Sequence, residues 1–161
     1  MCGIAGYVGD RESADVLVDA LSKLEYRGYD SAGIAVFDHG NIKVKKCKGR
    51  LANLVEKMDE EGKPQGHVGI GHTRWATHGE PSDINSHPHG NKRVTIVHNG
   101  IIENYKKLKD FLVGEGYSFA SETDTEVAAK LLDYYYDGDP MKTIAKVLSE
   151  IKGSYALGIM F

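Results

Sequence analysis

The sequence is poor in the residues that define several classes of protein. Its 161 residues include two cysteines, four prolines and one tryptophan. The cysteines, Cys2 and Cys47, lie in unrelated sequence settings and make a poor disulfide framework, which argues against a small disulfide-stapled secreted domain. No apolar run approaches the ~20 residues of a transmembrane helix, and the N-terminus lacks the basic and apolar regions of a signal peptide. We therefore expect a cytoplasmic protein that makes no membrane contact.

Charge and motifs also give no support for a nucleic-acid, nucleotide or metal-binding protein. The formal net charge of −3 provides no electrostatic attraction to nucleic acid. None of the 19 glycines belongs to a phosphate-binding motif that follows a predicted strand. The seven histidines occur without the H-E-x-x-H pattern or the paired cysteines of common zinc sites. We expect neither a metal nor a cofactor.

The length and the 41% hydrophobic content are sufficient for one domain with a substantial core. Alternation, helical periodicity and turn residues predict a layered domain of mixed strands and helices. Asp10 is expected to cap the first helix, and the polar segment 73–92 is expected to be a long functional loop. Strands are predicted at 3–8, 31–38, 41–48, 68–72, 94–98 and 153–161, and helices at 11–25, 51–61, 103–114, 125–136 and 141–152.

Cys2 is the most informative residue because removal of Met1 would place it at the chain terminus. Its freed α-amino group would have an ordinary pKa near 7.7–8.0, suitable for a general base at neutral pH. A nucleophile activated by its own chain terminus is a known alternative to a Cys–His pair. The alternative interpretation is a small buried cysteine that opens a strand.

Four further segments hold polar residues where packing alone would not require them. They are YRGYDSAG at 26–33, GHTRWATHGEP at 71–81, HPH with HNGIIEN across 87–104, and SETDTE at 121–126. These segments resemble the N-terminal glutaminase domains of the glutamine–fructose-6-phosphate aminotransferases, or glucosamine-6-phosphate synthases. That family belongs to the class II, or N-terminal-nucleophile, glutamine amidotransferases. The resemblance runs from Met1 to Phe161.

The resemblance implies an α+β fold, the αββα sandwich of two antiparallel sheets between helical layers, for a single glutaminase domain over 1–161. It also implies hydrolysis of L-glutamine through a thioester at Cys2. Asn99, through its side chain, and Gly100, through its backbone N–H, would form the oxyanion hole. Arg74 would bind the α-carboxylate and Asp124 the α-ammonium group. The same pocket would be lined by Trp75, Thr77 and His78, with Arg27, His87 and His98 in supporting positions.

These roles suit the chemistry of the residues, although simpler interpretations exist for each. A guanidinium offers a planar fork to a carboxylate, and a glycine permits close approach of the backbone. Asn99-Gly100 is, however, also a strong signal for a type I′ hairpin turn. Arg74 could form a surface ion pair, and either Thr123 or Asp124 could be a helix N-cap.

In that family a separate isomerase domain uses the ammonia to convert fructose 6-phosphate into glucosamine 6-phosphate, and the full enzyme is expected to be a homodimer. That domain is absent from the sequence, and family glutaminase domains continue past the equivalent of Phe161. We therefore expect the N-terminal part of a larger enzyme, lacking closing strands. Two alternatives stay open: a class II amidotransferase with a different acceptor, and a fragment that is catalytically silent because Met1 is retained or the domain is truncated.

Overall fold

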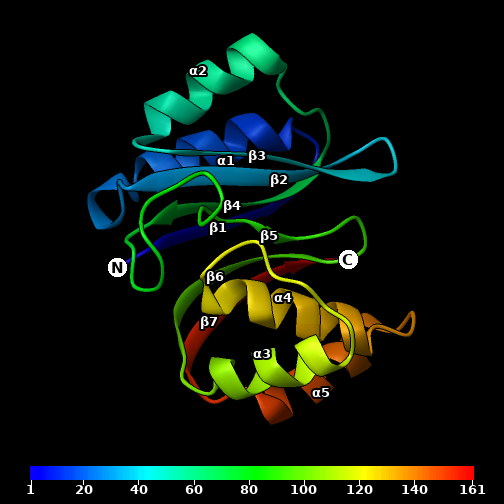
Figure 1. Cartoon of the computed structure of the whole chain (residues 1–161). Helices are drawn as coiled ribbons and strands as arrows, with labels where there is room; N and C mark the ends of the chain where they lie inside the picture. Colours follow the sequence, from blue (N-terminus) through cyan, green and yellow to red (C-terminus); the bar gives the residue numbers. More distant parts are fainter.

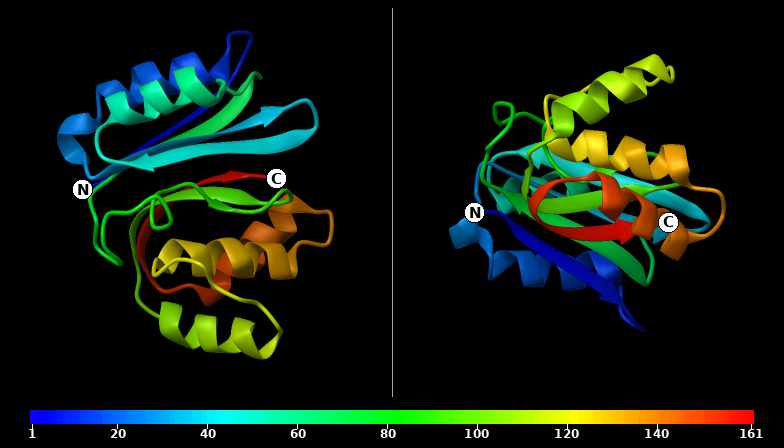
Figure 2. Two further views of the ribbon diagram at one scale, coloured as in Figure 1. Left: turned by 45° about the horizontal axis from the view of Figure 1, so that its top comes forward. Right: turned by 90° about the horizontal axis from the view of Figure 1, so that it is seen from below.

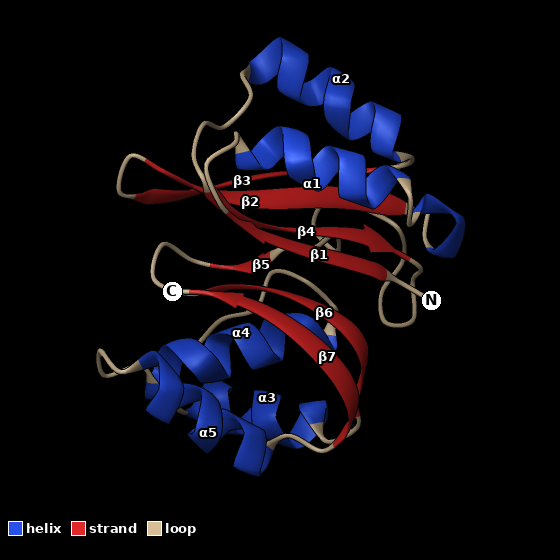
Figure 3. Ribbon diagram, turned by 180° about the vertical axis from the view of Figure 1, so that it is seen from behind, coloured by secondary structure: helices blue, strands red, loops and turns tan.

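The computed structural model describes residues 1–161 and has four layers, ordered helix, sheet, sheet, helix (Figure 1). Seen from behind, the strands of both sheets lie inside and the helices cover the two outer faces (Figure 3). This arrangement confirms the predicted αββα sandwich. None of the helices is both long enough and apolar enough to cross a membrane.

The first sheet contains four antiparallel strands and is covered by two helices. In spatial order the strands are β1 (Gly3–Val8), β4 (Val68–Arg74), β2 (Ser31–Asp38) and β3 (Asn41–Lys48). Its outer face packs against α1 (Ser13–Ser22) and α2 (Leu51–Glu61), with the short 3₁₀ helix η1 (Glu25–Arg27) after α1.

The second sheet has three antiparallel strands and is covered by three helices. Its strands, in spatial order, are β5 (His89–Gly90), β6 (Thr95–Ile102) and β7 (Gly153–Met160). The helices are α3 (Tyr105–Gly114), α4 (Asp124–Tyr135) and α5 (Pro140–Glu150).

The apolar core is divided among the layers. One cluster lies between the first sheet and its helices, and the largest lies between the second sheet and α3, α4 and α5. The space between the two sheets holds a much smaller buried cluster of Ala35, Ile70, Val97 and Met160. Because apolar side chains fill only part of that space, polar side chains can occupy the rest.

The first helix differs from its prediction at both ends. It begins at Ser13 with Glu12 at the N-cap position, so Asp10 does not cap it. Tertiary contacts explain the shift. The Glu12 carboxylate accepts a hydrogen bond from the Gly66 N–H at 2.9 Å, and the Ser13 N–H donates to the Gly66 carbonyl at 2.7 Å.

Two strands are longer than predicted, and both extensions include residues of the predicted site. β4 continues to Arg74, which pairs with Ser31 of β2. β6 continues through Asn99 and Gly100 to Ile102, paired throughout with β7. The Asn-Gly pair is therefore part of a strand, and its interpretation as a hairpin turn is wrong. The partner strand β7 lies far away in the sequence, so no local signal indicated the extension.

Gly33 of β2 lies in close contact with a segment that precedes β5. It pairs with Lys46 across β2 and β3, and a Cβ atom there would lie 2.1 Å from the carbonyl oxygen of His87. The segment that contains His87 therefore packs directly on the backbone of the first sheet.

We predict that Gly33→Ala lowers the free energy of unfolding by about 1–3 kcal/mol, the usual cost of forcing extra volume into a packed site. Gly6→Ala on β1 is the control, because a Cβ at Gly6 would meet no atom within 4 Å. Urea unfolding of the two variants and the parent chain measures both effects. Equal stability of the two variants would contradict the packing argument.

Candidate active site

Cys2 lies at the entrance to β1, beside the loop that follows β4. The pairing of Gly3 with Thr73 brings this end of β1 against the end of β4. The backbone N–H of Trp75 donates a hydrogen bond to the Cys2 sulfur at 3.3 Å. Two views show the N-terminus next to this loop (Figure 2, left, and Figure 1).

A narrow pocket opens beside Cys2, and we call it the inner pocket. It joins β1, the end of β4 and its loop, β6 and the start of α4, which are widely separated in the sequence. All the predicted site residues except Asn99 and Arg27 contribute to it. Its lining consists of Cys2, Arg74, Trp75, Thr77, His78, His87, His98, Gly100, Thr123, Asp124 and Thr125.

Asn99 lies on the other side of Cys2, in an adjoining outer pocket. Cys2 and Gly100 line both pockets, whereas Met1 and Asn99 line only the outer one. Gly100 has a φ of +131°, and a Cβ there would lie 2.0 Å from the carbonyl oxygen of Ser154. A glycine is thus required where β6 passes both β7 and the cysteine.

Arg74 is buried and organises the loop that covers the inner pocket. Its guanidinium donates to the carbonyl oxygens of Glu80 at 3.3 Å, Gly79 at 2.9 Å and also His78. The Asp30 carboxylate lies 4.0 Å away. Because a guanidinium has five N–H donors, two remain for another partner. A surface ion pair, the simpler interpretation, does not describe this side chain.

Asp124 is the first residue of α4, and its buried carboxylate lies at the positive end of the helix dipole. It accepts a hydrogen bond from the Ile102 N–H at 2.8 Å. The Nδ1 atoms of His78 and His98 lie 4.0 and 3.9 Å from its oxygens. The N-cap is Thr123, so the charge of Asp124 is not needed to cap the helix.

Four buried histidines fill the polar space between the sheets: His72, His87, His89 and His98. His72 and His87 stack with their ring centroids 3.9 Å apart. The Nε2 atom of His72 donates to the carbonyl oxygen of His98 at 2.9 Å. Burial lowers the pKa of all four, that of His72 to about 3, so the rings are neutral at physiological pH.

Thr125 connects two of these rings, a role that the sequence did not reveal. The His98 N–H donates to Nδ1 of His87 at 3.4 Å, which leaves the proton of His87 on Nε2. The Nε2–H group of the His87 ring donates to the Thr125 hydroxyl at 3.3 Å. The same hydroxyl lies 2.9 Å from Nδ1 of His98. Thr125 belongs to the SETDTE motif, but only its three-dimensional position indicates this contact.

The Cys2 thiol is held in its neutral form by its surroundings. Burial, with a smaller contribution from Asp30, raises its pKa against the opposing effects of the Trp75 N–H, the Met1 α-amino group and Arg74. A neutral thiol needs a base before it can attack a carbonyl carbon. Arg27 lines neither pocket, and its guanidinium instead lies 3.8 Å from the sulfur of Met1, the residue before Cys2.

Comparisons with known proteins agree with this geometry. Residues 72–161 match the glutamine amidotransferase domain family. The chain is 59% identical to glutamine–fructose-6-phosphate aminotransferase (isomerizing) of Clostridium tetani, covering 99% of this chain and 26% of that protein. The corresponding protein of Thermus thermophilus is 52% identical over 98% of this chain and 26% of its own length. The chain thus spans about a quarter of the curated relatives it matches.

The fold also has close counterparts among solved structures. Glutamine phosphoribosylpyrophosphate amidotransferase from B. subtilis, complexed with ADP and GMP, superimposes with a TM-score of 0.85 and 29% identity, covering 99% of this chain and 35% of that one. A structure described as the allosteric regulatory enzyme of purine biosynthesis gives 0.87 and 30%, with the same coverage. Together with the family match over more than half of the sequence, these findings show that the chain belongs to the glutamine amidotransferase domain family.

Proposed function

We propose that this domain hydrolyses the side-chain amide of L-glutamine to glutamate and ammonia. The observation that carries the proposal is the inner pocket, which joins the Cys2 thiol to a buried arginine and a buried aspartate. A free amino acid presents a carboxylate and an ammonium group at one end. In this proposal Arg74 and Asp124 supply the complementary charges, and Cys2, which lines the same pocket, faces the amide end of the substrate.

The chemistry requires removal of Met1, which frees the α-amino group of Cys2. That amine takes the thiol proton, and the sulfur attacks the amide carbon to form a tetrahedral oxyanion. The Asn99 side chain and the Gly100 N–H stabilise the negative charge; removal of one such donor typically costs ~10²–10³ in rate. The amine then returns the proton to the leaving nitrogen, which departs as ammonia. Water hydrolyses the thioester, releasing glutamate and the free thiol.

We further propose that the chain is the N-terminal part of a larger cytoplasmic enzyme that makes glucosamine 6-phosphate from fructose 6-phosphate. In this proposal a fused isomerase domain consumes the ammonia, and the whole enzyme is a homodimer. The high identity to glutamine–fructose-6-phosphate aminotransferases supports this acceptor over phosphoribosylpyrophosphate. Sequencing the remainder of the gene tests the choice directly.

A silent form of the same domain is the second candidate. Met1, when it is not removed, lines the outer pocket beside Cys2 and Asn99. While Met1 remains, the nitrogen of Cys2 is an amide and cannot accept a proton. Loss of acid–base catalysis costs typically ~10²–10⁴ in rate.

We predict that the processed chain releases glutamate from glutamine and that the chain retaining Met1 does not. Intact mass spectrometry verifies each preparation, and an enzymatic glutamate assay measures turnover. Cys2→Ala in the processed chain should abolish activity, whereas Cys47→Ala should retain it. Turnover by the Met1-bearing preparation would refute the terminal-amine mechanism.

We also predict that Asp124→Asn weakens glutamine binding by about 2–5 kcal/mol, the usual cost when a buried charge pair loses one partner. Calorimetry in a processed Cys2→Ala background measures binding without turnover. The amide retains an oxygen to accept the Ile102 N–H. The control ligand is 4-carbamoylbutanoate, which lacks the α-ammonium group. Its affinity should not fall in the variant; equal losses for both ligands would mean that Asp124 only supports the pocket.

A further inference from the structure

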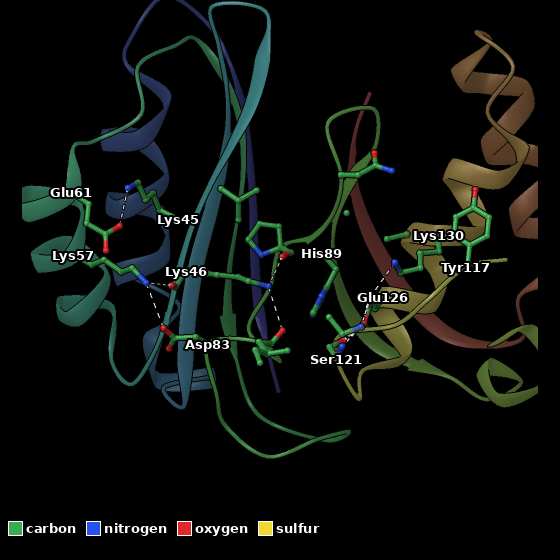
Figure 4. A pocket seen from close by; sticks show the side chains of 17 residues that line it. Lys45, Lys46, Lys57, Glu61, Asp83, His89, Tyr117, Ser121, Glu126 and Lys130 are labelled. Carbon is green, nitrogen blue, oxygen red and sulfur yellow. Dashed lines mark hydrogen bonds and ion pairs between the residues drawn. The ribbon is translucent and has the colours of Figure 1, made fainter. Parts of the chain in front are cut away.

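A second, larger cavity of about 600 Å³ lies behind the wall of the inner pocket (Figure 4). The wall is the segment from Ile84 to His89, which crosses between the two sheets. The segment borders both spaces, because Ile84, Pro88 and His89 line the second cavity whereas His87 lines the inner pocket. The position of this segment therefore sets the shape of the inner pocket.

Lys46 is the side chain that ties the wall to the first sheet. Its ammonium group donates to the carbonyl oxygens of Ile84 at 3.4 Å, Ser86 at 2.8 Å and Pro88 at 3.2 Å. Figure 4 shows the Lys46 side chain extending from the first sheet toward this segment. An ammonium group has three donors, so the three carbonyls use its full capacity.

This arrangement sets Lys46 apart from the other lysines of the cavity. Each of the others pairs with a carboxylate: Lys45 with Glu61, Lys57 with Asp83 and Lys130 with Glu126. Lys46 forms no ion pair, and burial lowers its pKa to about 8. The Lys46 side chain is partly buried, and the charges of Glu126 and Asp83 offset only part of the effect of burial on its pKa, so the three carbonyls are its direct partners.

The residue opposite Lys46 serves the same segment. Gly33 pairs with it across β2 and β3, and the carbonyl of His87 occupies the space that a side chain at Gly33 would fill. The wall is thus positioned by two sets of contacts: the close approach of the His87 carbonyl to Gly33, and the three hydrogen bonds from Lys46. Both contacts lie next to His87.

A displacement of His87 would also move the residues that it contacts in the inner pocket. Its ring stacks on His72, and its two nitrogens contact the His98 N–H and the Thr125 hydroxyl. His98 and Thr125 themselves line the inner pocket beside Asp124.

We propose that Lys46 is a positioning residue for glutamine hydrolysis, holding the Ile84–His89 wall so that His87 completes the inner pocket. The inference rests on the proposed function for its catalytic consequence, but its structural part is independent of it.

Three variants test the proposal in the processed chain. Lys46→Met removes all three donors and keeps an apolar stem, whereas Lys46→Arg keeps several donors. Lys45→Met is the matched control, because it removes a neighbouring lysine whose only partner is Glu61. The measurements are kcat and KM for glutamine, thermal unfolding, and the imidazole ¹⁵N resonances of His87 by NMR.

We expect Lys46→Met to lower kcat/KM by about 10- to 100-fold, the range that small misplacements cause, and to shift the His87 resonances. Lys46→Arg should restore most of both properties, and Lys45→Met should behave as the parent chain. If Lys46→Met fails to fold, Lys46→Gln is compared with Lys46→Arg in the same assays.

Two results would overturn the proposal: unchanged His87 resonances and kinetics in Lys46→Met, or equal losses in Lys46→Met and Lys45→Met. If the parent chain itself does not hydrolyse glutamine, the proposed function fails. The His87 resonances then decide by themselves whether Lys46 positions the wall.

Discussion

The antiparallel pairing of β1 with β4 connects Cys2, the proposed nucleophile, to the groups that would recognise its substrate. The register sets Gly3 against Thr73 and Val8 against Val68. Since side chains alternate between the faces of a strand, a slip of one residue would turn Cys2 away from the inner pocket. The other edge of β4 pairs with β2, with Arg74 opposite Ser31, so the same strand carries the arginine at a fixed position. A reactive group near a chain end is thereby given the rigidity of a sheet.

The division of the apolar core into separate clusters leaves space for polar side chains between the two sheets. Most buried apolar side chains lie between a sheet and its helices, where they stabilise the domain without approaching the cysteine. Between the sheets, a small apolar cluster is accompanied by imidazoles and hydroxyl groups. Thr125 provides a hydrogen-bond partner for one nitrogen each of His87 and His98, whereas Nδ1 of His72 and Nε2 of His98 have no partner within the protein. The polar site can therefore lie at the centre of the molecule.

Local sequence patterns predicted most elements, and their failures have a common cause. The hairpin of β2 and β3 and the helix α2 have the predicted bounds, because alternation, turn residues and periodicity are local signals. The ends of α1, β4 and β6 depend instead on distant partners. The residues of the inner pocket were indicated by family resemblance, since no spacing in the sequence relates Arg74 to Asp124. Thr125 and Lys46 were missed because their roles consist of contacts with segments remote in sequence.

The neutral imidazoles between the sheets make the fold itself responsive to acid. An unfolded histidine binds a proton near pH 6.5, whereas His72 in the folded domain does so only near 3. The unfolded chain therefore binds more protons in this interval, and the stability of the domain must fall as the pH drops from about 6.5 toward 3. The other three buried rings, whose pKa values are also lowered, act in the same direction. The buried histidines that line and support the inner pocket therefore make the folded state of this region dependent on pH.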